Sequence, residues 1–348
     1  MVITKISLRQ FTAFERLELV PSPGINVLIG TNATGKTHLM KVAYAACAVV
    51  KEDGTGFGEK LVRVFLPSQR KLGRLARRVQ GVSRASVSIH RGERRLTLSF
   101  AANQNDPRHA ETKGEREWVR APLECTYIPV KEMLANAPGF LSLYKNRETH
   151  FEEVYADLLH RAYLPLLKGP MEETRKRISN ILRQAIGGKV RTRGEEFFLE
   201  SSKGSIEFTL LAEGYRKLAL LWLLTQNGVL LSDKPTVLFW DEPEANLNPG
   251  LVGDVVDFLL ELQRCGVQVF VATHDYVVLK EFDLRKTGKD QVVYHALYRE
   301  KNGGPVNMET CTELADVHRN AILETFSRLY ERQMDRVFAD TVAAVVEK

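Results

Sequence analysis

A glycine-rich loop constrains this chain more than any other feature of its sequence. The segment GTNATGKT at residues 30–37 follows the apolar run INVLI at residues 25–29 and precedes helix-forming residues. It matches the pattern G-x-x-x-x-G-K-[ST], in which a loop between a buried strand and a helix wraps around phosphate groups. Gly30 and Gly35 let backbone N–H groups approach phosphate oxygens where side chains would intrude. The pattern therefore predicts an α/β fold that binds a nucleotide.

The residues that end this loop carry the rest of the predicted phosphate chemistry. Lys36 supplies a point charge for the β- and γ-phosphates, and Thr37 offers its hydroxyl to Mg²⁺. A helix from Lys36 to about Val50 adds the positive end of its dipole. A chance match is expected in about one chain in a hundred of this length, and the flanking strand and helix residues lower that further. The predicted nucleotide-binding residues of the loop are Gly30, Asn32, Gly35, Lys36, Thr37 and His38.

A second apolar run ends in two acids. The segment TVLFWDEP at residues 236–243 contains Asp241 and Glu242. A strand that is apolar throughout is typical of a parallel sheet buried on both faces, and ligands bind at the carboxyl ends of such strands. Asp241 is then placed to hold Mg²⁺, and Glu242 to polarise the water that attacks the γ-phosphate of ATP. The alternative, a pair of solvated acids, is weakened by the glycine-rich loop.

A third apolar run, VQVFVAT at residues 267–273, ends at His274. A histidine at the end of such a strand can hydrogen-bond the γ-phosphate and respond to its presence. A lone histidine after a strand is more often structural. The position of His274, one strand after Asp241 and Glu242, favours the functional interpretation, so Glu242 and His274 are the predicted catalytic residues.

These motifs together resemble the ABC-type ATPase heads of the SMC, RecF and OLD-like group. The opening segment ITKISLRQF at residues 3–11 and the loop at residues 25–37 look like the first hairpin and phosphate loop of that group. Residues 241–249, DEPEANLNP, are similar to its magnesium-site strand followed by the D-loop, and His274 matches its switch histidine. The resemblance covers about residues 1–50 and 205–278.

The resemblance implies a fold and an assembly. The expected fold is an α/β P-loop ATPase head with a mostly parallel core sheet, a flanking antiparallel sheet and an inserted helical lobe. Heads of this group bind and hydrolyse ATP at the interface of a homodimer, or of a higher homo-oligomer. Phe11 and Phe14 lie where the first hairpin approaches the adenine base in such heads, and either residue could equally belong to the core.

The signature motif of such heads is altered in this chain. The matching segment is LAEGYRK at residues 211–217, in which Gly214 is retained and Ala212 replaces the signature serine. Gly214 and the N-terminus of the following helix are expected to complete the partner's nucleotide site. Arg216 or Lys217 either supplies positive charge across the interface, as an arginine finger does, or is simply solvated.

The lengths of chain between and after the motifs indicate which branch of the group this chain resembles. The chain has no long heptad repeat, so a long coiled-coil arm is excluded. About seventy residues follow His274, too few for the Toprim nuclease domain of OLD-type proteins. Compact heads of this kind resemble the ATPases of prokaryotic antiphage and toxin–antitoxin systems, which control a separate effector protein. A RecF-like repair ATPase that clamps DNA, and an ATP-locked scaffold with negligible turnover, remain as alternatives.

The remaining sequence predicts four parts. Residues 1–130 are expected to form the nucleotide-binding lobe, with a hairpin over residues 86–100 and an exposed loop at residues 103–117. Residues 131–190 read as a helical lobe, because apolar residues recur at helical spacing. Residues 191–300 hold the signature, the two acids and His274, with strands at residues 195–211. Residues 301–348 are expected to form a helical tail.

Basic residues gather between positions 70 and 95. The chain carries a net charge of +6, and its first five clustered cations recur at a spacing that predicts one face of a helix. Such a face can meet the phosphates of a nucleic acid, although charge runs are more often solvated surface or a contact for an acidic protein. Aromatic residues are not interleaved, which argues against stacking on single strands. The cluster comprises Arg70, Lys71, Arg74, Arg77, Arg78, Arg84, Arg91, Arg94 and Arg95.

Composition limits the location of the protein. No stretch approaches about 18 consecutive apolar residues, so no membrane span is expected. The four cysteines are scattered without metal-ligand spacing, and the first residues do not have the layout of a signal peptide. These features favour a reducing, cytoplasmic location.

Overall fold

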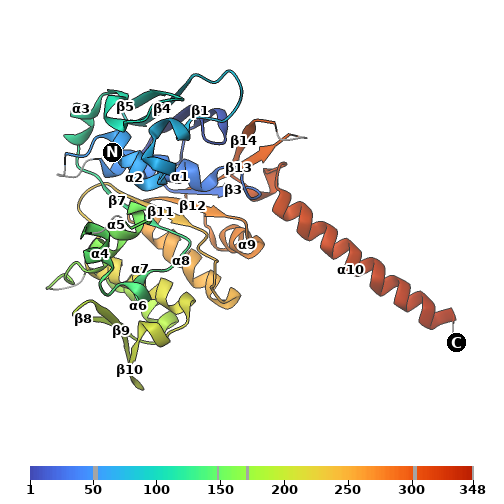
Figure 1. Ribbon diagram of the computed structural model, residues 1–348. Helices are drawn as coiled ribbons and strands as arrows, with labels where there is room; N and C mark the ends of the chain where they lie inside the picture. The colour runs from blue at the N-terminus through green and yellow to red at the C-terminus, as the bar shows by residue number, and fades with distance from the viewer. Residues whose placement is uncertain (50–53, 147–148, 170–171, 301–303, 347–348) are drawn as a thin grey trace.

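A six-stranded, mostly parallel sheet forms the centre of the molecule (Figure 1). The computed structural model describes residues 1–49, 54–146, 149–169, 172–300 and 304–346. The strand order is β14-β13-β3-β12-β11-β7, and only the β13–β14 pair is antiparallel. The strands are β3 (Ile25–Ile29), β7 (Glu124–Ile128), β11 (Thr236–Asp241), β12 (Gln268–Thr273), β13 (Val292–Arg299) and β14 (Val306–Cys311).

Both faces of this sheet are buried, as the continuous apolar runs predict. Along β11, Val237 and Phe239 point into one hydrophobic core, while Leu238 and Trp240 point into the other. Successive residues of a strand face opposite sides of its sheet, so a strand covered on both sides must be apolar at every position. The three strands expected before the glycine-rich loop, the acid pair and His274 are therefore confirmed as β3, β11 and β12.

One face of the central sheet is covered by two helices and an antiparallel sheet. Helix α1 (Lys36–Ala48) follows the glycine-rich loop, and its predicted end at residue 50 lies just outside the described residues. Helix α2 (Phe57–Phe65) packs in the same core. The five strands run in the order β2-β1-β4-β5-β6 and confirm the predicted hairpin. Their bounds are Lys5–Phe11, Phe14–Leu19, Arg84–Arg91, Arg94–Ala101 and Glu111–Lys113 for β1, β2, β4, β5 and β6.

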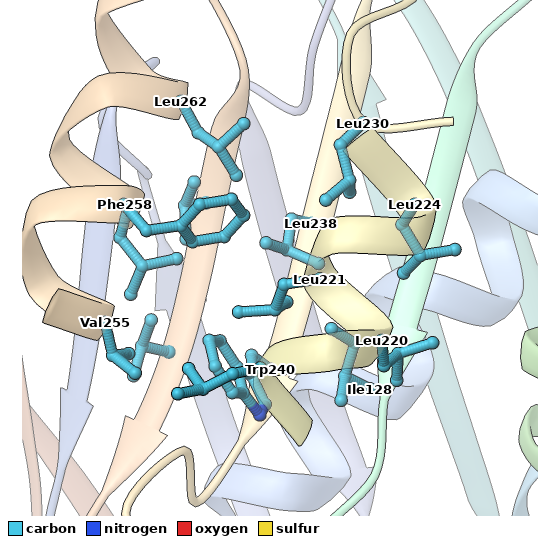
Figure 2. Close-up of a cluster of buried hydrophobic side chains, with 14 of the residues drawn as sticks. Ile128, Leu220, Leu221, Leu224, Leu230, Leu238, Trp240, Val255, Phe258 and Leu262 are labelled. Carbon is cyan, nitrogen blue, oxygen red and sulfur yellow. The ribbon is translucent and has the colours of Figure 1, made fainter. Parts of the chain in front are cut away.

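The other face is covered by helices. Figure 2 shows side chains of α7 (Glu213–Gln226) and α8 (Val252–Arg264) packed on β11. The predicted helical lobe follows β7 and closes with Gly187, which ends α6 in a left-handed conformation that suits glycine. Its helices are α4 (Phe140–Asn146), α5 (Glu153–Ala162) and α6 (Glu173–Ile186). A small antiparallel sheet precedes α7 and consists of β8 (Lys189–Arg193), β9 (Glu196–Ser201) and β10 (Gly204–Glu207).

The tail helix α10 (Ala321–Val346) extends away from the rest of the molecule (Figure 1). Asn320 begins it, because its Oδ1 accepts hydrogen bonds from the backbone N–H groups of Ile322 and Leu323. Its base packs on α9 (Tyr276–Arg285), where the rings of Tyr276 and Phe326 stack with centroids 4.4 Å apart. A tail helix was expected, and the structure adds that most of it projects free of the head.

Residues 103–117 are not the exposed loop that their polarity predicts. They contain β6, which adds a strand to the edge of the antiparallel sheet, and the start of α3 (Glu115–Val119). Trp118 explains the difference, because its side chain is fully buried and its Nε1 donates to the Ala46 carbonyl oxygen at 2.7 Å. A single large apolar residue thus anchors an otherwise polar segment.

The predicted basic helix is also absent from this part of the described chain. Residues 68–75 form two short 3₁₀ turns, and Ala76 then bridges to Phe11 of β1. Arg77 is paired with Glu15, and Arg84 is paired with Glu111. The exposed cations of the cluster come from separate turns, loops and strands and so share no helix face: Arg70, Arg74, Arg78, Arg84, Arg94 and Arg95.

Arg91 is buried and is therefore not part of a basic surface. Its guanidinium lies over the Trp118 ring at 3.9 Å and donates to the carbonyl oxygens of Trp118 and Ala121 at 2.6 and 3.2 Å. It therefore fastens α3 to the antiparallel sheet.

The four-part division at residues 130, 190 and 300 stays a prediction. Strand β7 at residues 124–128, which falls in the first predicted part, belongs to the central sheet.

Across the described ranges, no helix combines the length and apolar character needed to cross a bilayer.

Replacing Arg91 by alanine is expected to lower the free energy of unfolding by about 2–4 kcal/mol, because two buried carbonyl groups lose their donor and Trp118 loses its cation. The matched control is Arg94→Ala, which removes an exposed arginine from the same hairpin and should change stability by less than about 0.5 kcal/mol. Urea unfolding followed by tryptophan fluorescence measures both. Equal effects of the two substitutions would contradict the buried role of Arg91.

Candidate nucleotide and magnesium site

The glycine-rich loop lies between β3 and α1, at the carboxyl edge of the central sheet. Gly30 and Gly35 have φ angles of 153° and 94°. A Cβ atom on Gly35 would lie 2.6 Å from the Phe14 ring, and one on Gly30 would lie 2.4 Å from the Leu297 carbonyl oxygen. Only glycine fits at either position. Phe14 and Phe11 are fully buried, so both belong to the core, and Phe14 packs against the loop at Gly35.

Lys36 is buried within the loop that it follows. Its Nζ donates to the carbonyl oxygens of Gly30 and Thr31 at 2.6 and 3.2 Å. Burial lowers the pKa of Lys36, while the nearby Glu242 and Asp241 carboxylates act in the opposite direction. The ammonium group is thus held over the loop by uncharged carbonyl groups, which phosphate oxygens can replace as stronger, charge-assisted partners.

The two remaining candidates of the loop differ in character. Asn32 is exposed at the outer part of the loop. His38 packs against the Phe65 ring, and burial, assisted by the Lys41 charge, lowers its pKa to about 4. His38 is therefore neutral near pH 7 and can serve as a hydrogen-bonding group but not as a cation.

Asp241 ends β11 in a buried position beside the start of α1. Its Oδ2 accepts a hydrogen bond of 3.0 Å from the Tyr127 hydroxyl, whereas Oδ1 is buried and has no protein partner among the described residues. Burial raises the pKa of Asp241, although the hydroxyls of Thr37 and Tyr127 favour its ionised form. A buried carboxylate with one oxygen unused is costly, and a cation next to Thr37 would offset that cost.

The residues present therefore fit a magnesium ion. Mg²⁺ keeps several waters and is commonly bound through one or two protein oxygens together with substrate phosphates. Thr37 and Asp241 supply two such oxygens from neighbouring elements, and the phosphate loop lies beside them. The structure brings the two predicted metal-binding residues together.

Glu242 and His274 also meet, although they follow different strands. The Nδ1 of His274 lies 3.2 Å from Oε1 of Glu242. Glu242 has a φ angle of 48°, and its backbone N–H donates to the Ala272 carbonyl oxygen at 2.9 Å. A positive φ at a residue other than glycine costs energy and is held only by its surroundings. The strained turn brings the Glu242 side chain to the edge of the sheet where His274 follows β12.

The signature segment packs on its own chain. Gly214 lies in the first turn of α7, where a Cβ atom would come within 2.9 Å of the Asn246 carbonyl oxygen. Arg216 donates to Glu132 at 2.6 Å, and Lys217 donates to the Ala245 carbonyl oxygen at 2.6 Å. Both cations are bound within their own chain and little exposed, so the solvated surface predicted for them is wrong, while a charge supplied across an interface stays a prediction.

Two residues of the site could not be recognised from the sequence motifs. Tyr127 comes from β7, whose strand is paired with β11 so that Tyr127 lies opposite Phe239, two residues before Asp241. Glu244 follows the acid pair, and its buried carboxylate contacts the segment around His274. An apolar run at residues 125–128 is the only sequence signal for β7, and nothing in the sequence pairs it with β11.

Comparison with known proteins finds partial similarity to ATPase families. Residues 124–280 match the model described as AAA domain, putative AbiEii toxin, Type IV TA system. The chain is 35% identical to the DNA replication and repair protein RecF of Limosilactobacillus fermentum over 114 residues, which is 30% of each chain. It is 39% identical to the L-cystine import ATP-binding protein TcyN of Bacillus subtilis over 64 residues, 18% of this chain and 22% of the relative.

Solved structures extend the likeness over most of the chain. An SMC head bound to the C-winged helix domain of ScpA superposes with a TM-score of 0.56 at 14% identity, covering 90% of this chain and 99% of that one. An SMC head with an extended coiled coil, bound to the C-terminal domain of ScpA derived from Pyrococcus furiosus, gives 0.53 at 13% identity, covering 96% and 99%. The chain thus has the fold of an SMC head, and its partial matches support an ATPase head similar to those of SMC and RecF proteins.

The fold of this ATPase head agrees with the expected class, including the mostly parallel core sheet, the antiparallel sheet and the inserted helices. The alignments span only 22–30% of the length of the curated relatives named above.

Replacing Tyr127 by phenylalanine is expected to weaken magnesium binding, because Asp241 loses the hydroxyl that orients it. Loss of such a supporting hydrogen bond typically costs about 10–100-fold in metal affinity or activity. The measurement is a Mg²⁺ titration of ATP hydrolysis, in which the half-saturating Mg²⁺ concentration should rise. Tyr155→Phe is the control, because within the described residues the Tyr155 hydroxyl makes no hydrogen bond to Asp241, although it lies in the same region. An unchanged titration for Tyr127→Phe would contradict the role of this hydroxyl.

Proposed function

We propose that the head binds ATP in the glycine-rich loop and hydrolyses it at the carboxyl edge of the central sheet. The loop N–H groups and the Lys36 ammonium hold the β- and γ-phosphates. Thr37 and Asp241 would hold Mg²⁺, which when bound would supply neutralisation of the phosphate charge. The observation that carries the proposal is the convergence of Lys36, Asp241, Glu242 and His274 at one edge, from three separate segments.

Glu242 is the base in this proposal. Its carboxylate orients the attacking water and accepts its proton, while the Nδ1 of His274 at 3.2 Å holds that carboxylate in place. With Nδ1 directed at Glu242, the opposite ring nitrogen Nε2 is the one that can hydrogen-bond the γ-phosphate. His274 therefore links the phosphate to the base within one imidazole ring.

The complete site is proposed to need a second copy of the chain. Gly214 lies at the N-terminus of α7, where backbone N–H groups without helical partners attract phosphate. It is separated in sequence from the loop of its own chain, and heads of the resembled group offer this turn to the nucleotide of the partner. The output is proposed to be control of a separate effector protein in a prokaryotic defence or toxin–antitoxin system, a role supported by the family match over residues 124–280.

Replacing Glu242 by glutamine is expected to lower the rate of ATP hydrolysis by about 10²–10³-fold, because the amide cannot accept the proton of the attacking water. ATP binding should persist, and light scattering should show a dimer that outlasts that of the parent. Lys36→Ala is the matched control, since it should lose ATP binding and the dimer together. Parental turnover in Glu242→Gln would remove the catalytic assignment. A parent that binds ATP but releases no phosphate at any protein concentration would favour the scaffold alternative.

A second candidate function is ATP-dependent binding to DNA, favoured by the similarity to RecF proteins. The structure narrows the surface for it, because Arg77, Arg84 and Arg91 are engaged within the chain. Other cations of the cluster remain exposed, and among them Arg74 and Arg78 lie in one short segment: Arg70, Arg74, Arg78, Arg94 and Arg95.

If DNA binds there, the double variant Arg74→Glu, Arg78→Glu should weaken binding to duplex DNA and reduce the salt slope of log K by about two charges. Fluorescence anisotropy at several salt concentrations, with saturating ATP, measures both quantities. Arg191→Glu together with Lys176→Glu removes two exposed cations elsewhere and should leave the slope unchanged. Equal binding by both double variants would exclude Arg74 and Arg78 as the contact.

A further inference from the structure

The turn after the acid pair is tied to the switch histidine by one buried carboxylate. Glu244 is only 9% exposed in its side chain, and its Oε1 accepts from the Thr273 hydroxyl at 2.7 Å and from the His274 backbone N–H at 3.2 Å. Thr273 is the last residue of β12. The side chain of Glu244 therefore joins the segment after β11 to the segment after β12 across the edge of the sheet.

The same turn is bonded to α7 on its other side. The Nζ of Lys217, almost fully buried, donates to the Ala245 carbonyl oxygen at 2.6 Å. Gly214 packs so closely on the turn that a Cβ atom would meet the Asn246 carbonyl oxygen at 2.9 Å. Backbone bonds from Ala245 to Glu242 and from Leu247 to Glu244 keep the turn compact. Hydrogen bonds and close packing thus run without a gap from α7 to His274.

We infer that Glu244 is a positioning residue for hydrolysis, which holds His274 and through it Glu242. The inference rests on the proposed function, in which the start of α7 meets the nucleotide of a second copy. A shift of α7 on closure then moves residues 244–247 and, through the Glu244 carboxylate, the backbone of His274. Glu244 touches neither ATP nor water in this role. It fixes the 3.2 Å approach of His274 to Glu242.

The chemistry of the contact predicts which substitutions preserve it. Both donors use Oε1, whereas Oε2 is buried and has no protein partner among the described residues. Burial raises the pKa of Glu244, and the Thr273 and His274 donors act against that rise. The contact needs an acceptor at the Oε1 position and not a full charge. Glutamine retains such an acceptor in the same shape, and alanine removes it.

The experiment compares Glu244→Ala, Glu244→Gln and the parent in steady-state phosphate release with purified full-length chain, ATP and Mg²⁺. Glu244→Ala is expected to lower kcat by at least about 30-fold, because small displacements of catalytic groups cost on the order of 10²-fold. KM and the affinity for a fluorescent ATP analogue should stay within about threefold, since ground-state binding is untouched. Glu244→Gln should stay within about threefold of the parent in kcat. Thr273→Val removes one of the two donors and should give an intermediate loss.

A second measurement reports position without turnover. The ring signals of His274 in a ¹³C-histidine-labelled chain, identified among the eight histidines by their loss in His274→Gln, should shift or broaden in Glu244→Ala and be restored in Glu244→Gln. Parental kcat and ring signals in Glu244→Ala would overturn the inference. Glu244→Gln falling as far as Glu244→Ala would also overturn it, by showing that the charge itself is required. A parent without turnover would refute the proposed function, while the ring signals would still decide the role of Glu244.

Discussion

The register of three parallel strands is the constraint on which the rest of this head depends. β12 lies between β3 and β11, with Thr273 opposite Ile29 and Asp241 opposite Ala272. The three strands therefore end at nearly the same level, and the segments that follow them leave the sheet side by side. A shift of one residue would turn each strand's side chains to the opposite faces, which two closely packed cores do not permit. Hydrophobic packing far from the loop thus fixes the distances between its charged groups.

The site concentrates ionisable groups where water is scarce. Burial lowers the pKa of Lys36 and raises that of Asp241 and Glu244. The charged form of each side chain is therefore less stable here than in solvent. The carbonyl partners of Lys36 and the hydroxyl partners of Asp241 relieve this only in part. Negative oxygens near Lys36 and a cation near Asp241 would stabilise the charged forms of both side chains. A metal–triphosphate complex supplies both kinds of charge.

The sequence predicted local features well and the placement of long-range partners poorly. Continuous apolar runs were enough to predict β3, β11 and β12, because a doubly buried strand has few other possible sequences. Tyr127 and Glu244 escaped prediction, since each acts through a neighbour that only the strand order reveals. The prediction of a basic helix was wrong for a related reason. The cations that begin at residue 70 have helical spacing, but the backbone at Gln69 is not helical. Arg91 is buried because its guanidinium packs on Trp118, which is distant in sequence. The roles of Glu242 and His274 were read from position, and the structure adds their mutual contact.

The stacking of Tyr276 on Phe326 joins the base of the tail helix α10 to helix α9. Helix α9 begins two residues after His274, so the ring at the base of α10 stands close to the end of β12. With 26 residues at about 1.5 Å each, α10 is about 39 Å long. A tilt of about 5° at its base therefore carries its far end about 3 Å. The length of α10 alone therefore converts a small rotation of α9 into a larger displacement at the far end of the tail.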